Sequence, residues 1–238
     1  GLETDRSSYF ANVAAAKAFN YKWQLGKIGK PVDKTEWTMT PQTVNAYYNP
    51  LQNEIVFPAA ILQPPFFDPA ASPEMNYGAI GAVIGHEMTH GYDDQGSRFG
   101  PTGNFENWWT EDDAKGFAAR TAKLVAQFDA YEALPGLKVN GKLTLGENIA
   151  DLGGLATALD AMRTATAGTT DPMIDGMTRD QRFFVSFATA WRSQMTPDTL
   201  KVLVASNPHA PPQFRCAGAP SNLPAFAAHC LPVARSGN

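Results

Sequence analysis

The chain has 238 residues, of which 44% are hydrophobic and 18% charged, so it is long enough for one domain, or two tightly joined ones, with a real core. Its 20 glycines and 18 prolines are fewer than a low-complexity chain carries, which excludes global disorder. The net charge of -4 comes without a basic cluster, so neither a nucleic acid nor an acidic membrane surface is expected as a partner.

The first half of the chain predicts two helices with a hairpin between them. Residues 8–28 are rich in alanine and have apolar residues at helical spacing, which favours a helix. Residues 44–48 and 53–57 are typical of two short strands around a turn at Asn49-Pro50. Residues 76–92 are compatible with a helix despite their glycines.

The second half predicts further helices separated by irregular segments. Glycines and a proline in residues 96–103 indicate a loop. Residues 110–131 favour a helix because Thr110 can cap it and acidic residues follow in the first turn. Two more helices are expected, at residues 145–166 and 178–195. From residue 207 onward we expect a proline-rich tail that wraps the surface. Together these elements predict an α+β fold that is predominantly helical, with a small antiparallel sheet.

Hydropathy and cysteine content give only partial information on the cellular location of the protein. The longest apolar stretches, 55–67 and 75–85, are shorter than the roughly 18 residues of a spanning helix, so no membrane segment is expected in this chain. The sequence begins Gly-Leu-Glu, so we expect any targeting segment to have been removed or to lie in a longer precursor. Cys216 and Cys230 permit one disulfide in an exported protein, and two unpaired thiols are the alternative.

The strongest chemical signal is the run His86-Glu87-Met88-Thr89-His90. Residues four apart on a helix lie about 40° apart around its axis, so both imidazoles project from one face and can share a Zn²⁺ ion. Glu87 lies beside them and can act on a bound water. The apolar run 78–85 before the motif is typical of a buried helix, where polar groups without a ligand would be costly. The pattern predicts a site for one zinc ion.

Two histidines leave a catalytic zinc one protein ligand short. In the metzincin pattern a third histidine follows six residues after the second, but Gly96 stands there, and Asp93 stands where that pattern has a glycine. The other solution is a glutamate from a separate helix, and Glu147 is the candidate metal ligand. Asp151, one turn later on the same face, is expected to accept the outer N–H of a ligand imidazole and fix its tautomer.

Three motifs in this order and spacing resemble a known family. They are Val44-Asn45-Ala46-Tyr47-Tyr48, His86-Glu87-Met88-Thr89-His90 with the following Gly91-Tyr92-Asp93-Asp94-Gln95-Gly96, and Gly146-Glu147-Asn148-Ile149-Ala150-Asp151. The chain resembles the catalytic domain of the neprilysin family of zinc metalloendopeptidases over nearly all of residues 10–230. The resemblance implies that residues 1–238 form a mainly helical catalytic domain with a thermolysin-like zinc site.

The resemblance also implies roles for residues outside the metal site. Asn45 and Ala46 match residues that hold the substrate backbone from an edge strand. His209 matches a group that donates to the oxyanion of the tetrahedral intermediate, and Arg215 matches one that binds a substrate carbonyl and orders the site. Four further matches imply an apolar pocket that accepts a large hydrophobic side chain of the residue just after the cleaved bond. They are Ile61, Phe66, Val83 and Trp191.

The function implied is zinc-dependent endopeptidase cleavage of oligopeptides. Glu87 is expected to take a proton from water at the metal and return it to the leaving amine, with Asp151 and His209 supporting the reaction. The alternative is a non-catalytic, zinc-containing module that binds peptides. No candidate catalytic residue is degraded in the sequence, which favours the enzyme.

Two departures from the family pattern bear on partners. Family members are usually much longer and carry a large helical domain that precedes and caps the catalytic one, which this sequence does not include. A separate chain or segment that carries the cap is therefore an expected partner. The family commonly ends with a Cys and then a Trp, whereas no Trp follows Cys230, so the bridge of Cys230 stays open. The resemblance implies an extracellular or periplasmic location, as a secreted protein.

Overall fold

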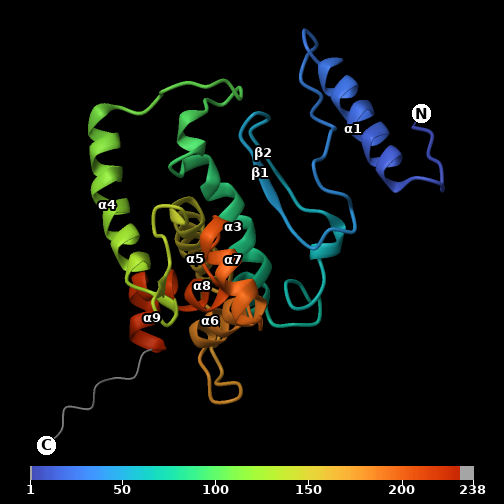
Figure 1. Cartoon of the computed structure of the whole chain (residues 1–238). Coiled ribbons are helices and arrows are strands. Elements are labelled where there is room, and N and C mark those ends of the chain that lie inside the picture. Colours follow the sequence, from blue (N-terminus) through green and yellow to red (C-terminus); the bar gives the residue numbers. More distant parts are fainter. Residues whose placement is uncertain (1, 231–238) are drawn as a thin grey trace, which may run out of the picture. The chain divides into compact units, whose positions relative to one another are not determined.

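The computed structural model describes residues 2–230 (Figure 1). The chain divides into two compact units, and the boundary along the sequence lies between Thr38 and Met39. The first unit contains helix α1 (Tyr9–Leu25) followed by an irregular segment. The side chain of Ser8 caps α1 by accepting the backbone N–H of Ala11 at 3.2 Å. The predicted first helix is thus confirmed, with an end three residues earlier than expected.

The second unit begins with the predicted hairpin. Strands β1 (Tyr47–Asn49) and β2 (Glu54–Val56) pair in antiparallel fashion, with Tyr48 opposite Ile55. The turn reaches to Asn53, whose φ of 49° is left-handed, so both strands are shorter than the sequence predicts. Among the described residues this sheet has only two strands, so each strand has one edge without a strand partner.

The predicted helix over 76–92 is a chain of short helical segments rather than one regular helix. A 3-10 turn η1 (Ala59–Ile61) and a long loop precede it. The segments are α2 (Pro73–Asn76), the π turn η2 (Tyr77–Gly81), α3 (Ala82–Thr89) and the 3-10 turn η3 (His90–Tyr92). The irregular part of this chain packs closely on a neighbour. A Cβ at Gly78 would lie 2.1 Å from the carbonyl oxygen of Phe183, so only glycine lets the two backbones approach in this way.

Helix α5 (Leu145–Ala165) packs against α3, and this is the most extensive contact between helices in the described part of the chain (Figure 1). Glycines make the close approach possible. A Cβ at Gly85 would lie 2.8 Å from Gly154 Cα, and a Cβ at Gly154 would lie 2.5 Å from the backbone nitrogen of His86. Because neither position carries a side chain, the first turns of α5 reach the face of α3 that carries the histidines.

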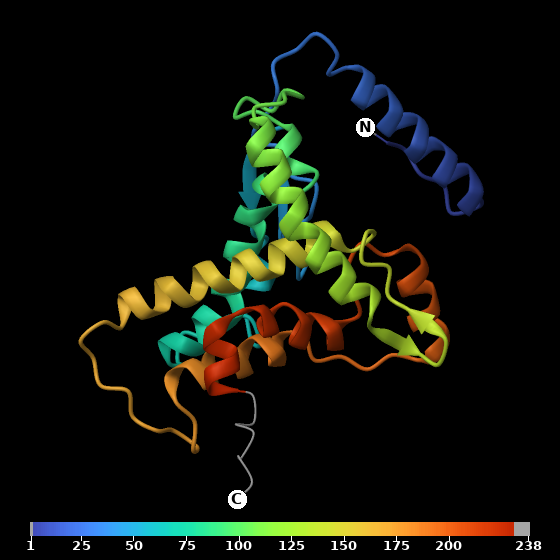
Figure 2. The same ribbon diagram turned by 90° about the vertical axis from the view of Figure 1, so that its left-hand side faces the viewer.

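Helix α4 (Glu111–Asp129) contacts both α5 and the C-terminal part of the chain, and Figure 2 shows it crossing α5. Its capping box joins Thr110 and Asp113, as the sequence predicts. A second hairpin, β3 (Glu132–Leu134) with β4 (Leu137–Lys138), follows α4 and was not predicted. The Pro-Gly pair in its turn was the available signal, since Gly136 has a φ of 78°.

The proline-rich tail from residue 207 onward contains short helices, which the sequence analysis did not predict. Helix α6 (Arg179–Ala190) ends earlier than expected, and the later helices each begin with a proline at their first position, where its missing N–H costs nothing. These later elements are α7 (Pro197–Ser206), α8 (Pro212–Gly218), the 3-10 turn η5 (Pro220–Asn222) and α9 (Pro224–His229). A further 3-10 turn, η4 (Gly96–Arg98), lies between α3 and α4.

Three apolar clusters form the core of the second unit. One joins α5 and α6 around Leu155, Met162 and Phe183, and another lies under α4 around Phe128. The third packs the segment before β1 against α3 through Ala46, Ile61, Ile80 and Val83, and it forms one wall of the site described below. The predicted class is confirmed, since the described residues form a mainly helical fold with two small antiparallel sheets.

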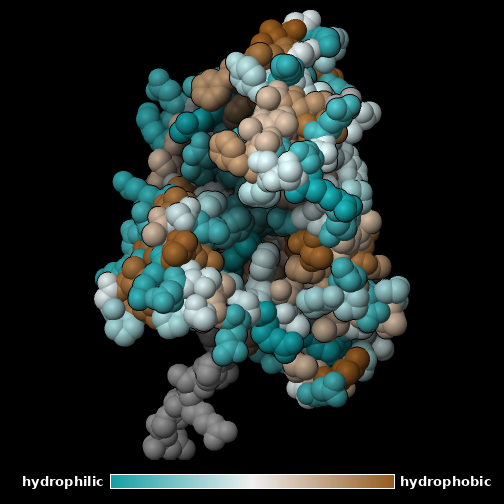
Figure 3. All heavy atoms as spheres, turned by 45° about the vertical axis from the view of Figure 1, so that its right-hand side comes forward, coloured by the Kyte–Doolittle hydropathy of each residue, from teal (hydrophilic) through white to brown (hydrophobic). Residues whose placement is uncertain are grey.

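Large apolar side chains also remain on the surface. Figure 3 shows them in several separate patches of the face in view. None of the described helices combines the length and the apolar composition that crossing a bilayer requires. Cys216 and Cys230 are both free thiols in this structure.

Candidate metal centre

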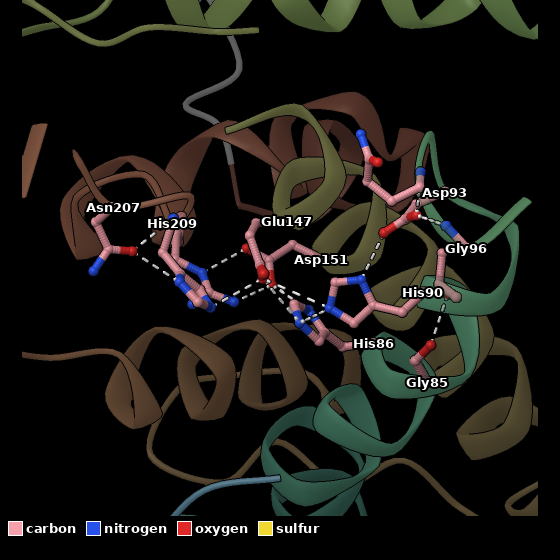
Figure 4. A network of polar contacts seen from close by, with 12 residues as sticks. Gly85, His86, His90, Asp93, Gly96, Glu147, Asp151, Asn207 and His209 are labelled. Carbon is pink, nitrogen blue, oxygen red and sulfur yellow. Dashed lines mark hydrogen bonds and ion pairs between the residues drawn. The ribbon is translucent and has the colours of Figure 1, made fainter. Parts of the chain in front are cut away.

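The two histidines of the motif face one another at the end of α3 (Figure 4). Their Nε2 atoms lie 3.0 Å apart, and the two rings meet edge to face with centroids 4.6 Å apart. His86 is buried and His90 half-buried. The helical spacing therefore does what the sequence predicts and directs both imidazoles to one point.

Glu147 reaches the same point from the first turn of α5. Its Oε2 lies 3.2 Å from His86 Nε2 and 3.7 Å from His90 Nε2. This oxygen is buried and makes no hydrogen bond of good geometry among the described residues. Burial alone would raise the pKa of Glu147, but the imidazoles of His209 and His86 outweigh burial and hold that pKa well below its usual range. Glu147 is therefore ionised and available as a ligand.

Two further carboxylates fix the orientation of the histidine rings. Asp151 Oδ1 lies 2.9 Å from Nδ1 of His86, and Asp93 Oδ2 lies 2.7 Å from Nδ1 of His90. A carboxylate can only accept here, so each Nδ1 carries a proton, and the neutral ring has its lone pair at Nε2. The Nε2 atoms of both histidines thus lie beside the buried oxygen of Glu147, where they can bind a metal (Figure 4).

This arrangement fits a bound cation. Three acceptor atoms converge within 3.0 to 3.7 Å in a buried position, where they repel one another unless a positive charge lies between them. Without a metal, burial lowers the pKa of His86, but the carboxylates of Asp151 and Glu147 outweigh burial and raise that pKa to about 9. His86 then carries a second proton, whose place a bound cation would take. Two imidazole nitrogens and one carboxylate oxygen are the donor set of catalytic zinc sites, which leave a fourth position open.

Glu87 lies beside the cluster as a second kind of carboxylate. Its carboxylate belongs to the group of His86, Glu87 and His90 ligand atoms that all lie within 4.8 Å of one another. It is buried and lines the cavity, and burial raises the pKa of its carboxyl group. A carboxylate with a raised pKa takes up a proton more readily than an exposed one, which suits a proton carrier better than a ligand.

Arg215 is held by Asp151 and by an aromatic ring. Its Nε and Nη2 donate to the two carboxylate oxygens of Asp151 at 2.7 and 2.6 Å, and its guanidinium carbon lies 3.8 Å from the ring centre of Trp191. Both members of the ion pair are buried. Asp151 thus links the candidate metal ligand His86 to Arg215.

His209 approaches the centre from the segment between α7 and α8. Its Nε2 lies 3.0 Å from Glu147 Oε2. Asn207 Oδ1 accepts the backbone N–H of His209 at 2.8 Å and lies 2.9 Å from His209 Nδ1. The same oxygen therefore anchors both the backbone and the ring of His209, so Nδ1 donates to it and Nε2 faces the cavity (Figure 4).

A cavity of about 580 Å³, called here the main cavity, opens beside the centre. Asn45 and Ala46 line it just before β1, with Asn45 exposed and Ala46 buried. The four residues of the predicted apolar pocket also line it, and the rings of Phe66 and Trp191 meet edge to face with centroids 6.3 Å apart. These four residues are Ile61, Phe66, Val83 and Trp191. The structure thus brings every predicted site residue except Asp151, which lies buried behind His86, to one cavity wall.

Sequence reasoning missed three contributors to this site. Asp93 holds His90 and also accepts the backbone N–H groups of Gln95 and Gly96, which closes the loop after η3. A Cβ at Gly96 would lie 1.8 Å from the carbonyl oxygen of His90, so the loop requires glycine there. Asn207 was also missed. Two local signals in the sequence could have identified these residues. Asp93 is an acidic residue three positions after His90, and Asn207 is an amide residue two positions before His209.

The fold and the centre together are those of a zinc metallopeptidase catalytic domain. The chain matches the model of peptidase family M13 over residues 45–231. It therefore belongs to peptidase family M13, the neprilysin family that the sequence motifs indicate.

Relatives support this assignment along most of the chain. An endothelin-converting enzyme homolog of Locusta migratoria is 45% identical over 94% of this chain and 31% of its own length. Neprilysin-3 of Drosophila melanogaster is 44% identical over 95% of this chain and 29% of its own length. The solved zinc metalloprotease ZMP1 of Mycobacterium tuberculosis, in complex with an inhibitor, superposes with a TM-score of 0.91 at 50% identity, covering 96% of this chain and 36% of that one. The chain thus spans about a third of the length of its relatives.

Proposed function

We propose that this chain carries the catalytic site of a zinc-dependent endopeptidase that hydrolyses oligopeptides. The observation that carries the proposal is the convergence of His86, His90 and the buried Oε2 of Glu147 on one point beside the main cavity. A zinc ion there would polarise the scissile carbonyl and lower the pKa of a bound water to about 7.

The residues of the chain then have separate tasks. Glu87 takes a proton from the water and passes it to the leaving amine, a role that its buried carboxyl group with raised pKa supports. In its doubly protonated form, His209 donates from Nδ1 to Asn207, which holds its ring, and from Nε2 to the oxyanion of the tetrahedral intermediate. Asp151 is a positioning residue, because it acts through His86 and Arg215 rather than on the substrate.

The substrate backbone binds along the unpaired edge near β1, at Asn45 and Ala46, and Arg215 orders the site beside it. The main cavity favours a large hydrophobic side chain just after the cleaved bond. What supports this preference is that the pocket residues Ile61 and Val83 are part of an apolar cluster. A set of peptides that differ only at this position tests it: phenylalanine or leucine is expected to exceed glycine and aspartate in kcat/KM. Equal rates for all four would contradict the preference.

The competing function is a zinc-containing module that binds peptides without cleaving them. Zinc content and hydrolysis of an internally quenched peptide, measured on the same preparation, separate the two. One zinc ion per chain with turnover supports the endopeptidase, and bound zinc with peptide binding but without turnover supports the module. The expected partners are oligopeptide substrates and a segment or chain that carries the cap, and a secreted location stays a prediction.

A further inference from the structure

A second cavity, of about 480 Å³, adjoins the main one. It is lined by the β1–β2 hairpin, by the end of α3 with η3, and by residues 99–101 and Trp108. Tyr48 and Phe99 line both cavities, so they form the wall that the two share. A peptide that lies in the main cavity along β1 therefore passes the second cavity within reach of a side chain.

Aromatic rings dominate the walls of the second cavity. Besides Tyr48 and Phe99 they include Tyr92 and Trp108, whose rings meet edge to face with centroids 6.3 Å apart. Tyr92 and Trp108 are 63% and 46% exposed, so their faces are open to a ligand. Aromatic faces attract cations through their quadrupoles, most strongly where water is partly excluded.

Glu54 is the only acidic residue among the described residues that line this cavity. Its Oε1 is buried and has no hydrogen-bond partner among the described residues. A buried carboxylate oxygen without a partner is costly and rare in folded proteins. A positively charged group in the cavity would remove that cost, and none of the described residues that line the cavity is a lysine, arginine or histidine.

We infer that the second cavity is a subsite for a basic side chain, arginine or lysine, of the peptide substrate. The methylene groups of such a side chain lie on the apolar walls, its charged end meets the aromatic faces, and Glu54 compensates the charge. The inference rests on the proposed endopeptidase function for its substrate, but its binding test does not depend on turnover.

The order of residues along α3 gives the position of this subsite on the peptide. Val83, in the apolar pocket for the residue after the cleaved bond, comes before the metal ligands His86 and His90, whereas Gly91 of the second cavity comes after them. Eight residues of helix span about 12 Å, which an extended peptide covers in about four residues. The basic side chain therefore belongs to the N-terminal side of the cleaved bond, three or four residues before it.

The test measures peptide binding to zinc-loaded protein in which Glu87→Gln suppresses turnover. Fluorescent peptides of one sequence carry arginine, norleucine or glutamate at each of the four positions before the bond, and in a control set after it. Mass spectrometry of wild-type products locates the bond. We expect arginine three or four residues before the bond to lower Kd about tenfold relative to norleucine, and to have no such effect after the bond.

Variants assign the effect to the cavity. Adding Glu54→Gln is expected to bring the arginine and norleucine peptides within about twofold of one another, and Tyr92→Leu to reduce the difference about threefold. Glu111→Gln removes the same charge from a 93% exposed side chain on α4 and is the matched control, expected to leave the preference unchanged. Thermal unfolding of each variant checks that it is folded.

Three results would overturn the subsite: equal Kd values for arginine and norleucine in the parent protein, a tighter norleucine peptide, or a preference that survives Glu54→Gln. A preference for arginine at every position, before and after the bond, would point to general attraction by the net charge and would also overturn it. A preference for arginine at one position of the peptide that Glu54→Gln abolishes, without any wild-type cleavage, would overturn the proposed function and leave the subsite standing.

Discussion

Glu87 and Glu147 are both buried carboxylates near the two histidines, yet the structure gives them different surroundings. Glu147 faces three imidazoles, whereas burial dominates at Glu87 and raises its pKa. We predict that Glu87→Gln keeps zinc bound and lowers turnover at least about 100-fold, because the amide keeps the shape but cannot accept the proton. Elemental analysis and a quenched-peptide assay measure the two quantities. Retention of more than about a tenth of the activity would remove Glu87 from the role of general base.

Asp93 is predicted to support metal binding through His90. Asp93→Asn should lower zinc affinity about 10- to 100-fold, because the amide is a weaker acceptor for the Nδ1 proton and supports the ring less well. Competition with a chelator of known affinity measures the change. Asp112→Asn, at a side chain that is 98% exposed on α4, is the control and should leave zinc affinity as it is. Equal zinc affinities for the two variants would show that Asp93 only closes its loop.

We predict that the ionisation of Asp151 makes the free energy of unfolding depend on pH. Burial alone would raise the pKa of Asp151, but the charge and hydrogen bonds of Arg215 outweigh burial and bring that pKa to about 2, below the usual value of 3.8. A carboxyl group whose pKa is lower in the folded state than in the unfolded state stabilises the folded state. This stabilisation is complete at pH values above the pKa of the unfolded state, and it is lost as the pH falls through the pKa of the folded state. The contribution is therefore about 2 kcal/mol above roughly pH 4, and it disappears towards pH 2.

Urea unfolding of the zinc-free protein between pH 5 and pH 2 measures this dependence. Removing zinc first separates the effect from acid release of the metal. The Asp151→Asn variant should start from a lower unfolding free energy, since Arg215 then stays buried without its counter-charge, but it should lose less on acidification. The same slope against pH in both proteins would mean that Asp151 is not the titrating group.

At the scale of elements, the site depends on how closely α5 approaches α3. We predict that Gly154→Ala destabilises the fold by about 1 to 3 kcal/mol and weakens zinc binding, because the added methyl group meets the backbone of His86 and Ala82 and moves Glu147 away from the histidines. Gly116→Ala is the matched control in another helix. Its Cβ would meet only the end of the Arg120 side chain, so this change should be neutral or stabilising by up to about 1 kcal/mol. Unaltered zinc affinity in Gly154→Ala would show that the glycine contact does not position Glu147.

At the scale of the whole molecule, we predict that the chain of 238 residues associates, with a partner that carries the cap or with itself. Helix α1 has no buried residue, and Tyr9 and Phe10 on it are 85% and 83% exposed. Burying apolar surface of this kind yields about 25 cal/mol per Å². Light scattering over a range of concentrations and a series of substrate lengths check the prediction. A monodisperse monomer whose rate peaks on short peptides would contradict it.

The sequence by itself determined the elements of the site that depend on local spacing. His86 and His90 lie four residues apart on a helix, and Glu147 and Asp151 do the same, so each pair lies on one face whatever the rest of the fold does. The hairpin before them and the helices α4 and α5 were also predicted, because capping residues and periodic apolar positions are local signals. The family motifs added His209 and Arg215, which no periodicity would have selected.

Only the tertiary structure decided which faces meet. The contact of Gly85 with Gly154 brings Glu147 within 3.2 Å of His86, and nothing in the spacing of two helices some 60 residues apart predicts that approach. The roles of Asp93 and Asn207 likewise depend on which nitrogen of a ring faces the cavity, and the second cavity exists only because the hairpin packs on the end of α3. Local propensity is short-ranged, whereas packing joins residues far apart in the chain, so the geometry of the centre is a property of the folded molecule.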